Sequence, residues 1–382
     1  MNAVDIMVRK AESMAKALER RALAAEQEGK LPAETVRDLS AEGLFSLVKP
    51  AIYGGKELNA AAVLKVCAAL GKGCASTGWV ACVYNVHHWI AAMYPDQAQG
   101  EYFGQDDVLS SASFAPSGTA VPTEGGYRAT GRWSFASGID YADWCFLTAR
   151  VDEPRDGDPA GPYFLMVPAA DYHIDHDSWQ VSGLRATGSK DVVLDETFVP
   201  IHRALFLPSL LSGTSPGSRI HQGPLYHMPG HPFLVAVLAT PVLGAIQRGV
   251  ELFRDRIVER RFSHTGQRQA EQPAAKVALA EADACVTAAR VLLENTFIAI
   301  ERLVPGASPL QHARIPRDTA FAVQLLVRAI DVVFENVGGA ALQESNPIQR
   351  IWRDVHAAKA HAAVNWNTQA LAWGELSLDD AN

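Results

Sequence analysis

A basic, an acidic and an imidazole side chain recur at helical spacing near the C-terminal end of the chain. Residues 350–367 read RIWRDVHAAKAHAAVNWN. At about 100° per residue, one face of a helix over this range would carry Arg350, Asp354, Ala357, His361 and Asn365. Histidine exchanges a proton near neutral pH, and the nearby alanines leave room for a bulky ligand. The spacing therefore predicts a helix that turns His361 toward a site, although a solvated ion pair beside a structural histidine would show the same spacing.

A second group of candidates is the run VHHW, in which His87 and His88 precede Trp89. The run lies in an apolar stretch over residues 60–94, which predicts a long helix that ends before Pro95. Adjacent residues of a helix point about 100° apart, so at most one of the two imidazoles faces a given site directly. A buried, satisfied histidine is the alternative for His88.

A third group lies in the β-rich segment YRATGRWSFASG, residues 127–138. It contains the aromatic residues Trp133 and Phe135 and ends with Ser137 before a glycine. Aromatic residues in a β domain are usually part of its core, and a serine before a glycine is common in turns. These residues become candidates for chemistry only through the pattern of the whole chain.

Composition limits the class of protein that must position these residues. The chain has 382 residues, of which 48% are hydrophobic and 20% charged, and its formal net charge is -8. This balance is typical of a folded enzyme, and the negative charge argues against nucleic acid or an anionic membrane as a partner. Five cysteines without a CxxC pair, and no apolar signal segment or uninterrupted run of about 18 apolar residues, favour a cytoplasmic protein without a membrane span.

The order of elements predicts an α+β protein in three parts. Residues 1–107 show helical patterns, residues 108–207 show short β-rich pieces between turns, and residues 208–382 show a linker followed by a bundle of roughly four or five helices. This order excludes a Rossmann or TIM-type alternation, and no glycine-rich phosphate loop or GxSxG elbow is present. The pair His227 and His231 lies among prolines and a glycine, so we expect no metal site there.

Six motifs in this order resemble those of the acyl-CoA dehydrogenase superfamily over essentially the whole chain. They are CASTGW (74–79), VHHW (86–89), GRWSFASG (131–138), GLRATGSKDV (183–192), GGAAL (338–342) and RIWRDVHAAKAH (350–361). Within that superfamily the chain is most similar to the two-component flavin-dependent monooxygenases of the aromatic hydroxylase type. Medium-chain dehydrogenases carry a glutamate base shortly after the RD pair of the last motif, whereas this chain has Ala362 there. An alanine cannot remove a proton, which argues against acyl-CoA desaturation.

The resemblance implies an acyl-CoA dehydrogenase-like fold and the activity of an oxygenase component. Such a protein would take reduced flavin, either FMNH2 or FADH2, from a separate NAD(P)H-dependent flavin reductase. With O2 it would hydroxylate a small phenol-like or indole-like substrate through a C4a-hydroperoxyflavin, and it would act as a homotetramer. An acyl-CoA dehydrogenase-like oxidase or dehydrogenase that holds its flavin permanently is the alternative, and a non-catalytic binding protein of the same fold is a third.

The resemblance also implies roles for individual residues. Ser137 would lie near the flavin N5, and His361 would stabilise the peroxide or act as acid or base. His87 would handle the hydroxyl proton of a phenol, with His88 and Trp89 lining the substrate. The residues expected to hold the flavin are Trp133, Phe135, Ser111, Ser113, Ser117, Arg261, Gly338 and Gly339, with Arg260 and Arg268 as alternatives to Arg261. Of these, Arg261, Gly338 and Gly339 would contact the flavin of a neighbouring subunit.

Overall fold

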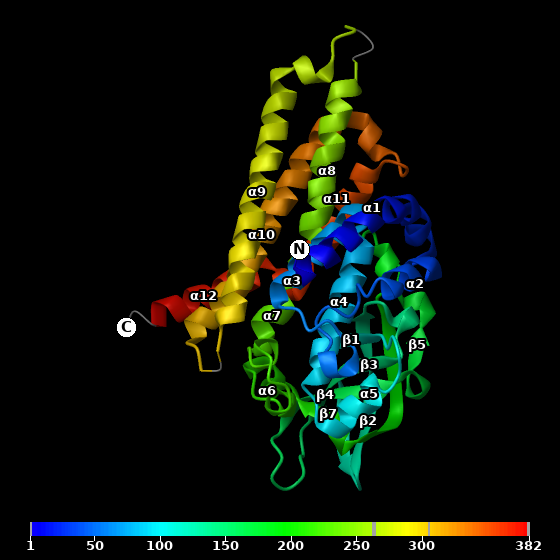
Figure 1. The fold of residues 1–382 in the computed structure, drawn as a ribbon, viewed down its shortest axis with the longest axis vertical. Helices are drawn as coiled ribbons and strands as arrows, with labels where there is room; N and C mark the ends of the chain where they lie inside the picture. The colour runs from blue at the N-terminus through cyan, green and yellow to red at the C-terminus, as the bar shows by residue number, and fades with distance from the viewer. Residues whose placement is uncertain (1, 262–264, 305, 380–382) are drawn as a thin grey trace.

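The structure is a computed structural model that describes residues 2–261, 265–304 and 306–379. A helical part comes first, a sheet follows, and a helical bundle completes the chain (Figure 1). The helices before the sheet are α1 (Ala3–Glu28), α2 (Ala33–Ala41), α3 (Ala60–Gly73), α4 (Ala75–Ala92) and α5 (Asp96–Phe103). The expected α+β order of helices, sheet and helical bundle is therefore confirmed.

The predicted single helix over residues 60–94 is wrong in one respect, because it breaks at Cys74. This residue is extended, with φ -159° and ψ 121°, and separates α3 from α4. The two helices then approach closely: a Cβ on Gly78 would lie 2.9 Å from the Cα of Gly71. Only glycine fits such a contact, so the fold at this crossing depends on both residues.

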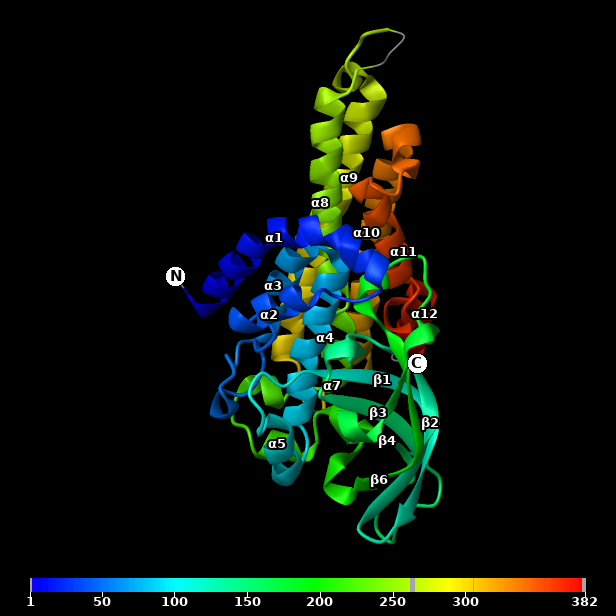
Figure 2. The same cartoon turned by 90° about the vertical axis from the view of Figure 1, so that its right-hand side faces the viewer.

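Seven strands form one sheet in the order β5-β6-β2-β1-β3-β4-β7. Their bounds are β1 (Ser110–Thr123), β2 (Gly126–Ala136), β3 (Trp144–Val151), β4 (Gly161–Pro168), β5 (His173–Asp175), β6 (Lys190–Pro200) and β7 (Ala204–Phe206). All neighbouring pairs are antiparallel except β1 and β3, which run parallel. One face of the sheet has its own apolar core, and α4 lies beside the sheet on the helical side (Figure 2).

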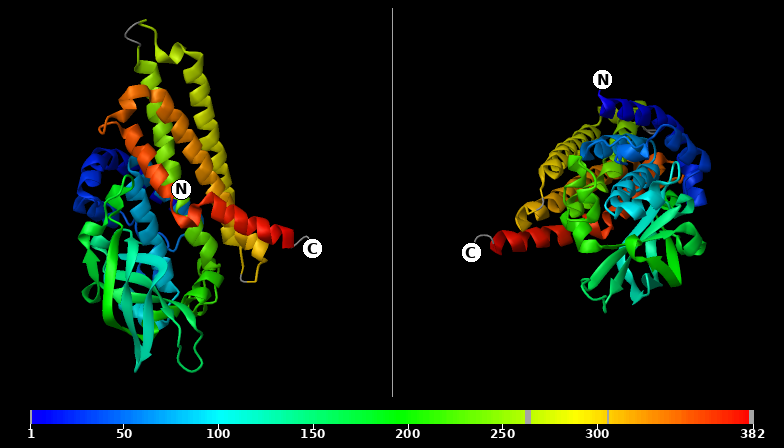
Figure 3. Two further views of the ribbon diagram at one scale, coloured as in Figure 1. Left: turned by 180° about the vertical axis from the view of Figure 1, so that it is seen from behind. Right: turned by 60° about the horizontal axis from the view of Figure 1, so that its bottom comes forward.

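The C-terminal part consists of α6 (Leu207–Ser212), α7 (Gly230–Ala236), α8 (Ala239–Glu259), α9 (Pro273–Arg302), α10 (Pro309–Val337), α11 (Pro347–Lys359) and α12 (Trp366–Asp379). Helices α8 to α11 pack together, whereas α12 points away from the body of the molecule and has no buried residue (Figure 3). The range Gly230–Glu259 is long and apolar enough to cross a membrane, but 83% of its most apolar window is buried inside the fold.

The helix expected over residues 350–367 is shorter than predicted. Helix α11 ends at Lys359, and His361 is extended with φ -65° and ψ 129°. The His361 Nδ1 accepts a hydrogen bond of 3.2 Å from the backbone N–H of Ala363, so the side chain caps a new turn and does not continue the helix. His361 therefore does not share the helical stripe of Arg350 and Asp354.

Candidate active site

Three segments far apart in the chain meet around Trp79, Ser137 and His361. The Trp79 Nε1 donates a hydrogen bond of 3.3 Å to the Ser137 Oγ. The rings of Trp79 and His361 lie 5.8 Å apart between centroids. Helix α4, the end of β2 and the turn after α11 thus supply one side chain each. Trp79 was not among the predicted site residues, although it ends the motif CASTGW.

A chain of hydroxyl groups continues from Ser137 into the protein. The Ser137 Oγ lies 2.8 Å from the Ser189 Oγ, which lies 2.7 Å from the Thr187 Oγ1. Thr187 in turn donates a hydrogen bond of 2.8 Å to the carbonyl oxygen of Leu184. Ser189 and Thr187 were not among the predicted site residues either. Their signal was present in the motif GLRATGSKDV, but only the fold brings that motif to Ser137.

Two predicted serines of β1 support the strand that carries Ser137. The Ser111 Oγ donates a hydrogen bond of 2.8 Å to the carbonyl oxygen of Ser137, and the Ser113 Oγ donates one of 2.9 Å to that of Ser134. Both side chains are buried. Ser117 lies beyond a register shift in β1 and is exposed. The hydroxyls of Ser111 and Ser113 therefore already have partners and hold the end of β2 in place.

The two aromatic residues of β2 face different environments. Trp133 is completely buried in the sheet core, where its Nε1 donates a hydrogen bond of 2.6 Å to the carbonyl oxygen of Thr148. It does not present its ring to a ligand, which corrects the expectation of a flavin contact. Phe135 has a positive φ of 66° and is 69% exposed. Its ring meets that of Trp179 edge to face at 6.1 Å, so this pair offers an accessible aromatic surface near Ser137.

Helix α11 positions the loop that carries the hydroxyl chain. The Asp354 Oδ1 accepts a hydrogen bond of 2.6 Å from the backbone N–H of Leu184. A Cβ on Gly183 would lie 2.1 Å from the carbonyl oxygen of Arg353, so the loop touches the helix backbone directly. Arg353 also forms an ion pair with Glu26 of α1. Asp354 of the predicted stripe thus fixes a loop, together with Arg353, which was not part of that stripe.

His87 is buried beside the first residue of β1. Its Nδ1 lies 2.6 Å from the carbonyl oxygen of Ser110, and burial lowers its pKa to about 4. A neutral imidazole that faces a carbonyl must carry its proton on that nitrogen. The Nε2 of His87 is therefore an acceptor, which suits it to take a proton from a hydroxyl group.

His88 and Trp89, which follow His87 in the VHHW run, are buried and hydrogen-bonded within the fold. The His88 Nδ1 lies 3.2 Å from the Tyr102 hydroxyl, which lies 2.6 Å from the Ser110 Oγ. Burial is the main cause that lowers the pKa of His88 to about 3. Trp89 is completely buried, and its Nε1 donates a hydrogen bond of 2.9 Å to the carbonyl oxygen of Leu225. The structure thus corrects the expectation that Trp89 lines a substrate.

His361 is exposed to solvent, unlike the histidines of α4. Protein atoms nevertheless surround its ring closely enough that desolvation lowers its pKa from the ordinary value. A lowered pKa keeps the imidazole neutral near pH 7, so one ring nitrogen can donate and the other can accept. Because Nδ1 accepts from Ala363, the proton of the neutral ring resides on Nε2.

The predicted flavin-tail residues lie at the end of the bundle away from the sheet, as the tip of α8 and the start of α11 show in Figure 2. Arg261 is exposed and donates a hydrogen bond of 3.0 Å to the carbonyl oxygen of Gly266. Arg260, the alternative, donates one of 2.9 Å to the carbonyl oxygen of Val337, next to Gly338. Gly338 has φ 74°, and Gly339 is exposed. These groups are apart from Ser137 of the same chain.

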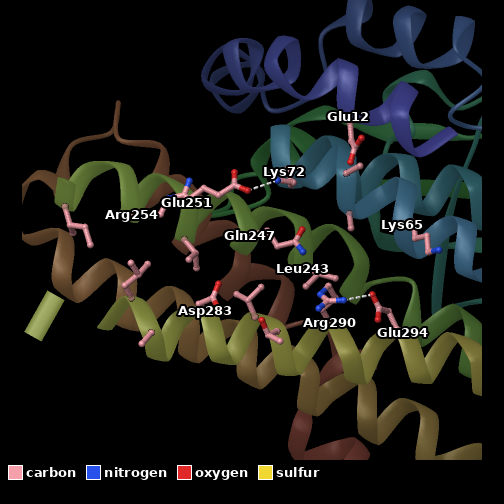
Figure 4. A pocket seen from close by; sticks show the side chains of 18 of the residues that line it. Glu12, Lys65, Lys72, Leu243, Gln247, Glu251, Arg254, Asp283, Arg290 and Glu294 are labelled. Carbon is pink, nitrogen blue, oxygen red and sulfur yellow. Dashed lines mark hydrogen bonds and ion pairs between the residues drawn. The ribbon is translucent and has the colours of Figure 1, made fainter. Parts of the chain in front are cut away.

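A groove of about 990 Å³ lies between α1, α3, α8 and α9. Figure 4 shows the ion pair of Lys72 with Glu251 on its wall, at 2.7 Å, and that of Arg290 with Glu294, at 2.9 Å. None of the candidate catalytic side chains lines this groove. We therefore do not assign the chemistry to this groove.

Comparison with known proteins places these features in a family. Residues 6–103 match the family model of the acyl-CoA dehydrogenase N-terminal domain, and residues 236–366 match that of the C-terminal domain. The FADH(2)-dependent resorcinol hydroxylase, oxygenase component, of Rhizobium sp. (strain MTP-10005) is 35% identical over 374 residues, which cover 92% of this chain and 89% of that protein. The flavin-dependent monooxygenase oxygenase subunit HsaA of Rhodococcus jostii (strain RHA1) is 34% identical over 351 residues, 91% of each protein.

Solved structures agree with this assignment. The crystal structure of 3-HSA hydroxylase from Rhodococcus sp. RHA1 matches with a TM-score of 0.90 and 30% identity, covering 98% of this chain and 96% of that one. The structure of XiaF from Streptomyces sp. in complex with FADH2 and glycerol matches with a TM-score of 0.90 and 31% identity, with the same coverage.

Proposed function

Because this chain belongs to the oxygenase components of flavin-dependent monooxygenases built on the acyl-CoA dehydrogenase fold, we propose that it hydroxylates a small phenol-like or indole-like aromatic substrate. It uses O2 and reduced flavin delivered by a separate NAD(P)H-dependent reductase. The observation that carries the proposal is the meeting of Ser137, Trp79 and His361, with an acceptor nitrogen of His87 on the same helix as Trp79. The names of relatives that act on resorcinol and p-hydroxyphenylacetate support a phenol.

The residues around Ser137 fit a flavin. The exposed Phe135–Trp179 pair offers an apolar surface for a flat ring, and the partly exposed Ser137 offers a hydroxyl beside it. We favour FAD over FMN because the resorcinol hydroxylase is FADH(2)-dependent and the XiaF structure contains FADH2. Bound reduced flavin supplies the two electrons with which one atom of O2 enters the substrate and the other leaves as water.

Two histidines of the protein would form hydrogen bonds within the site, His87 to the substrate and His361 to the bound oxygen species or the substrate. His87 remains neutral because burial lowers its pKa to about 4, so its Nε2 can accept a hydrogen bond from a phenol hydroxyl. That hydrogen bond draws the hydroxyl proton away from the phenol oxygen and raises the electron density of the aromatic ring. His361, neutral with its proton on Nε2, can donate a hydrogen bond into the site. Ala362 supplies no carboxylate base, which disfavours the acyl-CoA dehydrogenase alternative.

We propose a homotetramer in the cytoplasm for the assembled enzyme. Helix α9 exposes Val277, Val291 and Ile298, which repeat at multiples of seven residues and suit the packing of a second helix. The groove beside α9 is open along the same helix. Arg260, Arg261 and Gly338 are apart from Ser137 of their own chain, as residues that hold the flavin tail of a neighbouring subunit would be. All five cysteines are free, which suits a reducing compartment.

Anaerobic titration with FMNH2 and FADH2, followed by mixing with oxygen and resorcinol, tests the proposed function. We expect a nearly colourless purified protein that binds reduced flavin and yields a hydroxylated product by chromatography. A tightly bound yellow flavin that octanoyl-CoA bleaches would overturn the proposal in favour of a dehydrogenase. Light scattering tests the tetramer, with Val291→Glu as the variant expected to dissociate it and Val121→Glu, on the exposed sheet surface, as the control.

A further inference from the structure

The directions of the hydrogen bonds in the hydroxyl chain follow from counting protons. Three short contacts link Leu184 O, Thr187 Oγ1, Ser189 Oγ and Ser137 Oγ in that order, and the three hydroxyls have one proton each. The carbonyl oxygen of Leu184 can only accept, so Thr187 must donate to it. Thr187 then has only lone pairs for Ser189, and Ser189 must donate to Thr187.

The same count fixes the role of Ser137. Because Ser189 has used its proton, the Ser137 hydroxyl must donate to Ser189. The indole N–H of Trp79 can only donate, so it occupies one lone pair of the Ser137 Oγ. One lone pair remains on Ser137, which is partly exposed, whereas Ser189 and Thr187 are buried. Ser137 thus offers the site an acceptor and no donor.

We propose that the Thr187–Ser189 chain makes the site selective for reduced over oxidised flavin, an inference that rests on the proposed function and on Ser137 lying near N5. Reduced flavin carries a proton on N5 and can donate it to the free lone pair of Ser137. Oxidised flavin has a bare lone pair on N5, which would face the lone pair of Ser137 without a proton between them. Thr187 and Ser189 are therefore positioning residues that set the polarity of Ser137.

The surrounding contacts hold the segments of Ser137 and Ser189 close to each other. Lys190, next to Ser189, forms a buried ion pair with Asp140, three residues after Ser137. The backbone N–H of Gly138 donates a hydrogen bond of 2.8 Å to the carbonyl oxygen of Thr187, and the Tyr84 hydroxyl donates one of 2.6 Å to that of Gly138. The segments of Ser137 and Ser189 are thus tied together on both sides of the hydroxyl contact, and neither serine can turn away easily.

The test compares the affinities of oxidised and reduced FAD by anaerobic calorimetry on the full-length protein. In Ser189→Ala the proton of Ser137 loses its acceptor and becomes free to turn toward the flavin. We expect the ratio of Kd for oxidised FAD to Kd for reduced FAD to fall by about tenfold, the size of one good hydrogen bond. Thr187→Ser keeps the hydroxyl and should retain the wild-type ratio, whereas Thr187→Val should lower it. Ser212→Ala, exposed on α6, is the matched control.

The outcomes separate this inference from the proposed function. A wild-type protein that binds neither form of flavin overturns the proposed function and the inference with it. A wild-type protein that binds reduced flavin but shows no preference for it overturns the inference alone. So does a Ser189→Ala variant that is folded by circular dichroism and keeps the wild-type ratio. If Ser189→Ala does not fold, the two Thr187 variants decide. The Kd ratio should be lower in Thr187→Val than in Thr187→Ser, and equal Kd ratios in the two variants overturn the inference.

Discussion

A hydrogen bond of 2.6 Å joins the backbone N–H of Leu184 to the Oδ1 of Asp354, although 170 positions separate the two residues. The carboxyl group is buried, and burial raises its pKa to about 6. The folded protein therefore holds this proton more tightly than the unfolded chain, in which an aspartate has a pKa of about 3.9. The stability that Asp354 contributes through this proton is fully present below about pH 4 and is lost as the pH rises through about 6.

Asp354→Asn should remove this pH dependence, because the amide oxygen can still accept from Leu184 but does not titrate. As the pH falls from 7 to 4, the wild-type free energy of unfolding should gain about 2–3 kcal/mol relative to that of the variant. Urea denaturation across this range measures the difference. Asp152→Asn, at an exposed position, is the control, and a difference that stays constant with pH would contradict the prediction.

His361→Ala is expected to lower product formation by about 10²–10⁴-fold, the usual worth of a general acid or base. The fold should persist, because the side chain is exposed and its hydrogen bond to Ala363 caps only one short turn. The variant should still consume reduced flavin and oxygen but release the oxygen as peroxide. Product yield by chromatography and Tm are the measurements. Normal yield in a folded variant would remove His361 from the mechanism and leave His87 as the main candidate.

Ser137→Ala should still bind flavin, with the affinity for reduced FAD lowered by about tenfold at most, and should increase the hydrogen peroxide released per NADH consumed in the assay coupled to a reductase. The reason is the loss of the acceptor oxygen that Trp79 and Ser189 hold in place. Ser113→Ala is a useful comparison, because its hydroxyl is bonded to a backbone carbonyl and not to Ser137. Unchanged coupling in Ser137→Ala would reduce this serine to a turn residue.

Two substitutions of His87 separate its two nitrogens. His87→Asn places an N–H near the carbonyl oxygen of Ser110 but removes the acceptor at Nε2. We expect kcat for a phenol to fall by about 10²-fold or more with little change in Tm. Since burial lowers the pKa of His87 to about 4, the wild-type activity should show no loss from its protonation between pH 6 and 8. Equal activity of His87→Asn and wild type would exclude Nε2 from the reaction.

The buried pair of Asp140 and Lys190 predicts a non-additive response. Asp140→Leu leaves the Lys190 ammonium buried without its partner, which should cost about 3–5 kcal/mol of the free energy of unfolding. The double variant Asp140→Leu with Lys190→Met, which replaces both charges with apolar groups, should recover most of that loss. Denaturant titration of the single and double variants forms the cycle. Additive losses would show that the pair is not coupled.

The order of regions could be predicted from the sequence, because helical and strand periodicities differ over long stretches. The helix break at Cys74 had a signal in Gly73, the residue before it, which was not used, whereas no glycine or proline lies next to His361 to mark the end of α11. At His361 the side chain itself ends the helix by capping the next turn. His361 was predicted to lie at the site because of a helical stripe with Arg350 and Asp354, but the helix ends before His361.

The candidate site could be predicted only in part. Ser137, His361 and His87 were named from motifs, but the partners that give them their chemistry come from contacts over long distances in the chain. Trp133 and Phe135, two residues apart, would face the same side of a regular strand. The positive φ of Phe135 and the register shift of β2 against β6 send one ring into the core and the other to the surface. No local pattern in the sequence reports such a bulge.

The contact of Gly183 with the backbone of Arg353 has a consequence for enzyme engineering. A side chain at Gly183 would have no space, since its Cβ would lie 2.1 Å from a carbonyl oxygen. Any replacement must lift the loop that leads to Thr187 and Ser189 from α11. Directed-evolution libraries that aim to change the aromatic substrate should therefore hold Gly183 constant. A variant without Gly183 should be uncoupled: it would consume NADH and release hydrogen peroxide in place of product, although every catalytic side chain is intact.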